Sequence, residues 1–243
     1  MLKLIKTLCE LFGPSGMEDA VRARIIEEID GHCEYRVDPL GNLIAFKKGE
    51  KTPKNKLLIA AHMDEVGFII THAEESGLLR FACVGGIDTR VIVGKRLRVG
   101  ECGICGVIGT KPVHLVKPDE RDKMPEVDNL FIDIGARDRE DALRLVAPGD
   151  CAVFDSDFVP FGDGLIKAKA LDDRAGCAVM INLIQSPLAC DTWFAFNVQE
   201  EVGCRGAVAS AYSVAPDCAI VLETTTAADI AGVESGKEVC GLG

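Results

Sequence analysis

Acidic and imidazole side chains stand at four separated places in the sequence where a secondary-structure element is expected to begin or end. These residues are His62, Asp64, Asp172, Glu200, Glu201 and Glu223. Carboxylate oxygens and imidazole nitrogens are ligands that suit Zn, Co and Mn in proteins. If these side chains met at one point, they could hold divalent cations and activate water for hydrolysis.

Two of the local patterns can be read either as catalytic or as structural. Residues two apart in an extended segment point the same way, so Asp64 can orient the His62 imidazole toward a metal. The alternative is a buried histidine with a satisfied partner. Adjacent residues point to opposite sides, so one of Glu200 and Glu201 can bind a cation while the other accepts a proton from water. The alternative there is a solvated acidic turn.

The other two patterns are also open when taken alone. Asp172 can bridge two cations, because each carboxylate oxygen can take one metal, or it can simply favour the start of a helix. Glu223 ends an apolar strand, where a charge is costly unless it is solvated, paired or bound to metal. Thr224 and its neighbours make solvation plausible.

The elements that would position these side chains have the pattern of an α/β protein at both ends of the chain. Apolar spacing predicts a helix over residues 2–12, and Ser15 with Glu18 has the spacing of a capping box at the start of a second helix. The apolar run 56–61 indicates a central strand that ends at His62. After residue 164, helices are expected from Asp172 and over 205–212, and strands over 192–198 and 218–222.

The middle of the chain has a different pattern. Short β-like runs punctuated by glycine, such as 68–71 and 91–93, surround a single predicted helix at 138–145. The predicted fold is therefore α/β, with a mostly parallel sheet flanked by helices and an inserted small β-rich domain. The first domain comprises residues 1–66 and 156–243, and the insertion comprises 67–155. Ligands are expected beyond the carboxyl ends of the parallel strands.

Composition excludes several classes of protein. The chain has 243 residues, 48% apolar content and a net charge of −11. A binding partner made of nucleic acid is disfavoured, because phosphates require a Lys/Arg surface. No run reaches the roughly 18 apolar residues that a bilayer requires, so no membrane partner is expected. The 11 scattered cysteines suit reduced thiols in a cytoplasmic protein.

Three segments taken together resemble one family. They read AHMDEVG at 61–67, KALDDRAG at 169–176 and QEEVG at 199–203. This ordered set is similar to the dinuclear-metal aminopeptidases that include tetrahedral (TET), deblocking and glutamyl aminopeptidases, some of which are labelled endoglucanases. The resemblance implies a cytoplasmic enzyme that removes N-terminal residues from peptides with two divalent metal ions (Zn, Co or Mn) per subunit.

The resemblance also implies a role for each residue. Asp172 would bridge the two metals, His62 and Glu223 would complete one site, and Glu201 would bind the second metal. Glu200 would be the general base, and Asp64 would orient His62. The family commonly has Asp where this chain has Glu223. The insertion resembles the domain through which family members form dimers, and those dimers build twelve-subunit shells.

One departure from the family pattern bears on activity. Members continue beyond the point that corresponds to Gly243, and that continuation carries a histidine ligand for the second metal. The histidines elsewhere in this sequence, His32, His72 and His114, lie in other parts of the pattern. The expectation is that the 243-residue form binds at most one metal ion tightly and has little or no peptidase activity.

Two other functions compete with this hypothesis. A pair of carboxylates can hydrolyse glycosides without metal, as in an endoglucanase. However, the chain has one Trp and two Tyr, which are few for a sugar-binding cleft. A non-catalytic assembly subunit is the second alternative. The presence of the full set of candidate metal and base residues argues against a site that lost its activity long ago.

Overall fold

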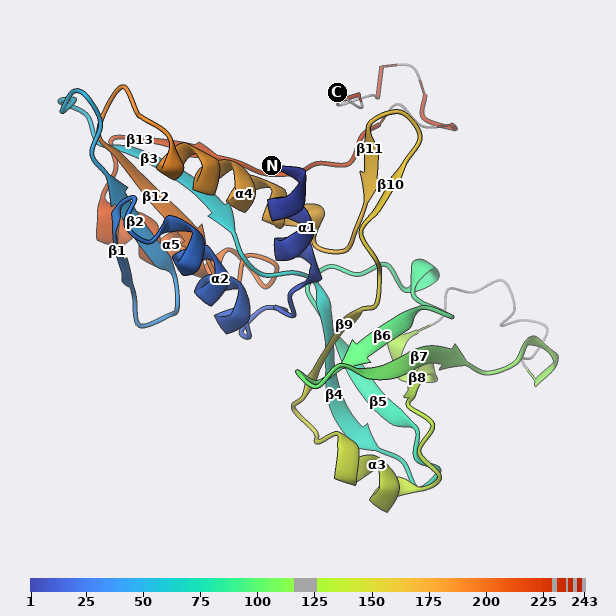
Figure 1. Ribbon diagram of the computed structural model, residues 1–243. Helices are drawn as coiled ribbons and strands as arrows, with labels where there is room; N and C mark the ends of the chain where they lie inside the picture. The colour runs from blue at the N-terminus through green and yellow to red at the C-terminus, as the bar shows by residue number, and fades with distance from the viewer. Residues whose placement is uncertain (116–125, 229–230, 235, 238–239, 242–243) are drawn as a thin grey trace.

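The computed structural model describes residues 1–115, 126–228, 231–234, 236–237 and 240–241. It shows an α/β part and a β-barrel that projects from one end of its sheet (Figure 1). The predicted fold class is confirmed. In the part of the chain that is described, no helix has the length and apolar character needed to cross a membrane.

The α/β part is built from both ends of the sequence. Its helices are α1 (Leu2–Glu10), α2 (Asp19–Ile29), α4 (Leu171–Gln185) and α5 (Arg205–Val214). Its sheet strands are β1 (Glu34–Val37), β2 (Leu43–Lys47), β3 (Leu57–His62), β12 (Thr192–Asn197) and β13 (Cys218–Val221). A separate hairpin pairs β10 (Val159–Phe161) with β11 (Leu165–Lys167).

The sheet is mixed, with order β1-β2-β12-β3-β13. Strands β12, β3 and β13 run parallel, whereas β1 and β2 pair in antiparallel fashion. The parallel strands all end at the same edge. Residues that follow β3, β12 and β13 are therefore brought to one side of the molecule, as ligand sites in α/β sheets require.

Two hydrophobic layers cover the sheet, and the alternation of side chains along its strands separates them. Phe194 and Phe196 of β12 face the cluster formed with α1, α2 and α4. Ala195 faces the smaller cluster that Val214 of α5 closes on the opposite side. Helices α1, α2 and α4 thus pack on one face and α5 on the other (Figure 1).

The second helix begins differently from the prediction. Helix α2 starts at Asp19 after Glu18, and no side chain caps its first turn. The Ser15 hydroxyl instead donates a hydrogen bond to Asp64, 49 positions away. The capping-box interpretation was therefore wrong, because a distant carboxylate takes the hydroxyl that the local pattern assigned to the helix.

The barrel occupies the middle of the chain. Its elements are β4 (Gly67–Ala73), β5 (Leu79–Val84), η1 (Thr89–Val91), β6 (Arg96–Val99), β7 (Ile104–Thr110), η2 (Val113–Leu115), η4 (Val127–Asn129), β8 (Leu130–Asp133), α3 (Arg139–Leu145) and β9 (Cys151–Phe154). Among the described residues, six antiparallel strands close in the order β4-β5-β8-β7-β6-β9 around their own apolar core.

One segment of the barrel differs from its predicted conformation. The run 91–93 reads as extended, yet Val91 ends the 3₁₀ turn η1. The Asp88 carboxylate accepts a hydrogen bond from the Arg90 N–H and so caps this turn. Helix α3, by contrast, begins as predicted, with Asp138 accepting from the Asp141 N–H.

The barrel leaves the α/β part directly after the central strand. Residues 63–66 connect β3 to β4, and β9 leads back toward β10 and α4. We propose the domain boundaries expected above, which keep every barrel strand within 67–155. The crossing at 63–66 therefore places the barrel beside the strand ends that carry the acidic residues.

A buried cation ties the start of the chain to the crossing segment. The guanidinium of Arg174 is fully buried and donates to the carbonyl oxygens of Met63 (2.6 Å), Leu8 (2.6 Å) and Gly13 (3.3 Å). It also lies 3.5 Å from the Glu65 carboxylate. One side chain of α4 thereby holds α1, the turn after it and the connection to the barrel.

The ammonium group of Lys169 extends this network. It lies 2.6 Å from Glu65 Oε1 and donates to the Leu11 carbonyl at 2.7 Å. Burial lowers the pKa of Lys169, although Glu65 opposes this effect. Two cations thus share one buried carboxylate, and backbone carbonyls supply the remaining acceptors.

We expect Arg174→Met to lower the free energy of unfolding by about 3–5 kcal/mol. The substitution leaves buried carbonyl groups without a hydrogen-bond donor and leaves Lys169 as the cationic partner of Glu65. Urea unfolding followed by circular dichroism measures this change. Arg144→Met is the control, since Arg144 is 60% exposed and pairs only on the surface of α3. Equal midpoints for the two variants would contradict the structural role of Arg174.

Candidate metal centre

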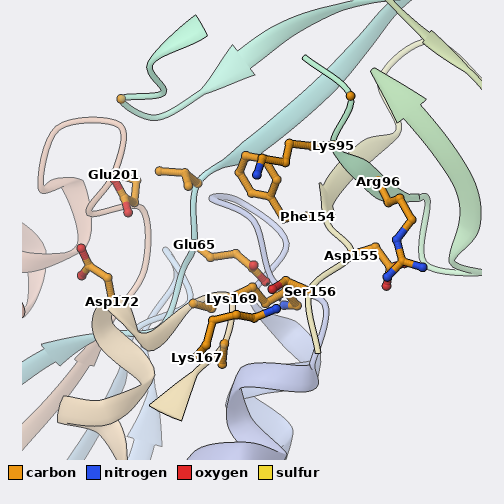
Figure 2. A pocket seen from close by; sticks show the side chains of 15 residues that line it. Glu65, Lys95, Arg96, Phe154, Asp155, Ser156, Lys167, Lys169, Asp172 and Glu201 are labelled. Carbon is orange, nitrogen blue, oxygen red and sulfur yellow. Dashed lines mark hydrogen bonds and ion pairs between the residues drawn. The ribbon is translucent and has the colours of Figure 1, made fainter. Parts of the chain in front are cut away.

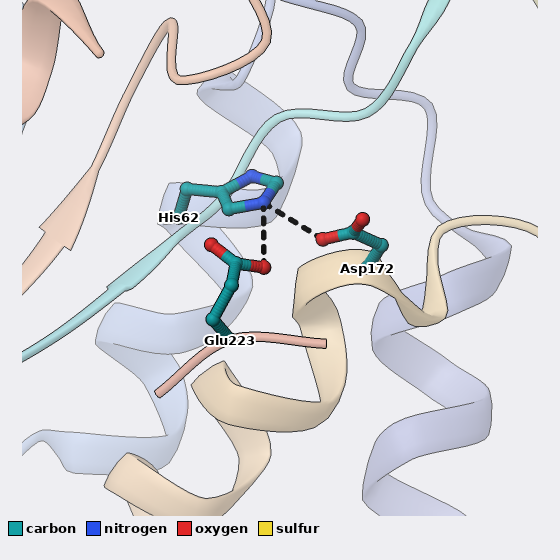
Figure 3. A group of neighbouring side chains, drawn as sticks. All are labelled: His62, Asp172 and Glu223. Carbon is teal, nitrogen blue, oxygen red and sulfur yellow. Dashed lines mark hydrogen bonds and ion pairs between the residues drawn. The ribbon is translucent and has the colours of Figure 1, made fainter. Parts of the chain in front are cut away.

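The imidazole of His62 is the centre of the candidate site. It lies at the end of β3 and is 3% exposed. Its Nδ1 faces the connection to the barrel, 3.1 Å from the Asp64 carbonyl oxygen and 3.3 Å from Asp64 Oδ1. Its Nε2 faces the opposite way, 3.0 Å from Asp172 Oδ1 and 3.7 Å from Glu223 Oε1 (Figure 3). Asp64 thus engages one nitrogen while the other meets two carboxylates.

Asp64 also organises the loop that follows β12. Its carboxylate is fully buried and accepts from the Ser15 hydroxyl (2.6 Å) and from the backbone N–H groups of Glu200 (3.0 Å) and Glu201 (3.1 Å). Burial opposes ionisation, but hydrogen bonds from His62, Ser15 and Glu200 outweigh it and hold the pKa of Asp64 below its ordinary value. This group is therefore an anion that fixes three chain segments.

A second buried carboxylate supports the same loop. Glu18 accepts from the backbone N–H groups of Gly16 (2.8 Å) and Gln199 (3.1 Å). Gln199 adopts a left-handed φ of 55°, and it directly precedes the two glutamates. Sequence reasoning missed this role of Glu18, because a capping box accounted for its position and nothing local indicates a partner 181 residues away.

The two aspartates at the start of α4 have separate roles. Asp172 is 54% exposed and points toward His62, whereas Asp173 is buried. Asp173 accepts from the Gly176 N–H at 3.0 Å, and a Cβ at Gly176 would lie only 2.4 Å from its carboxylate. The peptide bond between them is cis. Asp173 accepts a hydrogen bond from a backbone N–H in the first turn of α4, whereas the carboxylate of Asp172 faces the site.

Ligand atoms of the candidate residues converge in two overlapping groups. His62, Asp172 and Glu223 offer atoms within 4.8 Å of one another, and so do His62, Glu200 and Glu201. Figure 3 shows the first group, in which residues from β3, α4 and the segment after β13 point toward one another. All six residues that the sequence singled out are thus brought to one end of the sheet.

The charge balance of this group fits a divalent cation. Burial and the carboxylates of Asp172, Asp64 and Glu200 raise the pKa of Glu201 to about 7. Burial also raises the pKa of Glu223. Within the described residues no Lys or Arg lies within ion-pair distance of these carboxylates. Oxygen donors with one imidazole are a ligand set that Zn, Co or Mn accepts, and a cation there would relieve the repulsion.

The neighbouring carboxylates also act on the pKa of His62. Burial alone would lower its pKa, but hydrogen bonds to Asp172 and Asp64 raise the pKa of the imidazole to about 11. The same hydrogen bond from His62 holds the pKa of Asp172 below its usual value. The carboxylates around the imidazole therefore stabilise positive charge at this place.

A cavity of about 810 Å³ opens onto this group from the junction of the two parts. Asp172 and Glu201 lie at one end of it, and Lys95, Arg96 and Phe154 of the barrel segment line the other (Figure 2). The cavity is large enough for several residues of an extended peptide.

Comparison with known proteins identifies the family. A family model described as M42 glutamyl aminopeptidase matches residues 41–243. The chain belongs to the M42 glutamyl aminopeptidase family. M42 proteins are dinuclear metallopeptidases, so the chain is a metallo-aminopeptidase of this family. A putative aminopeptidase of Acetivibrio thermocellus is 42% identical over 247 residues, which cover all of this chain and 72% of that protein.

Two solved peptidase structures have the same architecture. The TET aminopeptidase of Thaumarchaeota archaeon SCGC AB-539-E09 has a TM-score of 0.93 and 38% identity, covering all of this chain and 70% of that chain. The TET1 peptidase of Pyrococcus horikoshii, described as assembling into a tetrahedron or a large octahedral shell, has a TM-score of 0.83 and 37% identity. That match covers 94% of this chain and 72% of that chain. The family resemblance seen in the sequence is confirmed.

Proposed function

We propose that the chain is a metal-dependent aminopeptidase that hydrolyses N-terminal residues from peptides. The observation that carries this proposal is the convergence of His62, Asp172 and Glu223 within 4.8 Å, beside Glu200 and Glu201, in a member of the M42 family. Asp64 supports the proposal because it holds the His62 ring and the loop of both glutamates at once.

We propose two metal positions of unequal strength, based on the donor set. His62, Asp172 and Glu223 would hold one ion, and Asp172 with Glu201 would hold the second. When bound, such ions polarise a peptide carbonyl and make water a nucleophile near neutral pH. A catalytic zinc site normally has about three protein ligands, a number that only the first position reaches with the described residues. We therefore propose that the first position holds its ion more tightly than the second does.

Glu200 is the residue placed to move a proton. Its carboxylate lies in the second group with His62 and Glu201, and the Asp64 carboxylate fixes its backbone N–H. We propose that Glu200 accepts the proton of the attacking water and passes it to the leaving amine, as general bases of hydrolases do. The cavity between the two parts would receive the peptide.

Titration with Zn²⁺ by calorimetry should show one tight equivalent per chain. Asp64→Asn should weaken it by roughly 10- to 100-fold, because the amide cannot both orient His62 and accept from three donors. Asp157→Asn is the matched control, since it makes the same charge change at an exposed residue. Two tight equivalents, or equal affinities for the two variants, would argue against this assignment.

Release of a chromophore from aminoacyl substrates tests the activity. At micromolar metal we expect little turnover, and at millimolar metal we expect release to appear as the weaker position fills by mass action. Glu200→Gln should lower kcat by roughly 100-fold or more while leaving zinc affinity within a few-fold, because it removes only the proton acceptor.

A second substrate, cellulose, and a chelator separate the alternatives. An endoglucanase would release sugar from cellulose regardless of chelator, whereas a metallo-aminopeptidase stops when chelator is added. A non-catalytic assembly subunit would release nothing at any metal concentration. Either result would overturn the proposed activity of this chain.

We further propose that the barrel mediates self-association to dimers and twelve-subunit shells. The Pyrococcus horikoshii TET1 peptidase is described as assembling into a tetrahedron or a large octahedral shell. Exposed apolar side chains on the barrel, such as Val91 and Val107, offer contact area. Light scattering coupled to size exclusion should therefore give a mass of at least two chains, and Val107→Lys should reduce it. A monomer throughout the micromolar range would contradict this proposal.

A further inference from the structure

The carboxylate of Glu200 is held by a thiol. Cys204 Sγ lies 3.1 Å from Glu200 Oε1, with the geometry of a hydrogen bond in which the thiol donates. In the described part of the chain, no other side chain donates a hydrogen bond to this carboxylate, and no Lys or Arg forms an ion pair with it. Among the described residues, the other polar contact of Glu200 with a side chain goes through its backbone N–H, which donates to Asp64.

A tight turn brings the thiol to this position. The N–H groups of Gly203 and Cys204 both donate to the Glu200 carbonyl at 2.8 Å, so the chain folds back on the glutamate before α5 begins. Cys204 has a left-handed φ of 53°. Glycine or asparagine adopts that conformation at lower cost, so the backbone gives no reason for cysteine there. The contact with Glu200 does give one.

We propose that Cys204 is a positioning residue for Glu200: its thiol holds the carboxylate in the orientation that it has beside His62 and Glu201. This inference rests on the proposed role of Glu200 as general base. Cys204 acts through Glu200 and not on substrate, and a thiol is a weak donor. The expected contribution is therefore several-fold in turnover and not an all-or-none requirement.

The contact can be measured without peptidase activity. Cys102, Cys204 and Cys218 are all exposed, which makes Cys102 and Cys218 internal references for thiol reactivity. The hydrogen bond to Glu200 and its negative charge raise the pKa of Cys204. Iodoacetamide should therefore modify Cys204 more slowly than the two references, as read by peptide mass spectrometry at short times.

Glu200→Gln provides the matched comparison. It should speed modification of Cys204 by roughly 3- to 10-fold, because the acceptor charge is gone, and leave Cys102 and Cys218 unchanged. If Cys204 reacted as fast as the references in the unmodified chain, or if Glu200→Gln had no effect on it, the contact would not exist and the proposal would fall.

The positioning role requires a kinetic comparison at saturating metal. Cys204→Ala should lower kcat by roughly 3- to 10-fold with KM and zinc affinity unchanged, since it frees the carboxylate without touching a ligand. Cys204→Ser, which keeps a donor, should recover most of the loss. Cys102→Ala, in a barrel turn, should have no effect.

These outcomes separate the positioning role from a structural one and from the function itself. Loss of zinc affinity or a lower unfolding midpoint in Cys204→Ala, or no rescue by serine, would assign Cys204 to the turn and overturn the proposal. If the unmodified chain released no residue at any metal concentration, the proposed function would fall and the positioning role with it. The labelling would still show whether the thiol and the carboxylate meet.

Discussion

The arrangement of the molecule depends on a cation buried where three segments meet. Arg174 neutralises part of the charge of Glu65 and caps the carbonyl groups of Leu8, Gly13 and Met63. A buried guanidinium without partners would destabilise the fold by several kcal/mol. The three carbonyl groups are therefore held in hydrogen-bonding position around Arg174. Because Met63 lies between His62 and Asp64, the position of the metal centre is linked to the packing of α1.

Repulsion between clustered carboxylates makes the candidate site electrostatically unfavourable for folding. Asp64, Asp172, Glu200, Glu201 and Glu223 gather around one imidazole at the ends of three parallel strands. Backbone N–H groups and the Ser15 hydroxyl compensate the charge of Asp64, whereas burial and the neighbouring carboxylates raise the pKa of Glu201. Groups of this kind are typical of functional sites, where ligand binding relieves repulsion that folding leaves in place.

The sequence allowed much of this to be predicted, because apolar runs with an acidic or imidazole residue at their end have a direct structural meaning. Parallel strands place their carboxyl ends together, so the sequence pattern predicts His62, Glu200 and Glu223 at one edge of the sheet. The β-rich insertion was visible as a change from long apolar runs to short glycine-punctuated ones, but its closure into a barrel was not predicted.

What could not be predicted depends on contacts between distant segments. Ser15 and Glu18 had a sufficient local explanation, and only the folded chain shows that they serve the loop after β12. Lys169 and Arg174 would ordinarily be placed on the surface, since charged residues are rarely fully buried without partners. Their partners are mainly carbonyl groups more than 100 residues away, which leave no pattern in the sequence.

The barrel is inserted so that the residues proposed for chemistry and part of the cavity wall lie in different segments of the chain. Every candidate ligand and the candidate base lie outside the barrel strands, while Lys95, Arg96 and Phe154 form the far wall of the cavity. Substitutions in the barrel can thus remodel what the cavity admits without disturbing the residues at the strand ends. The fold is modular in this sense: one chain segment can diversify in selectivity while the other keeps a single chemistry.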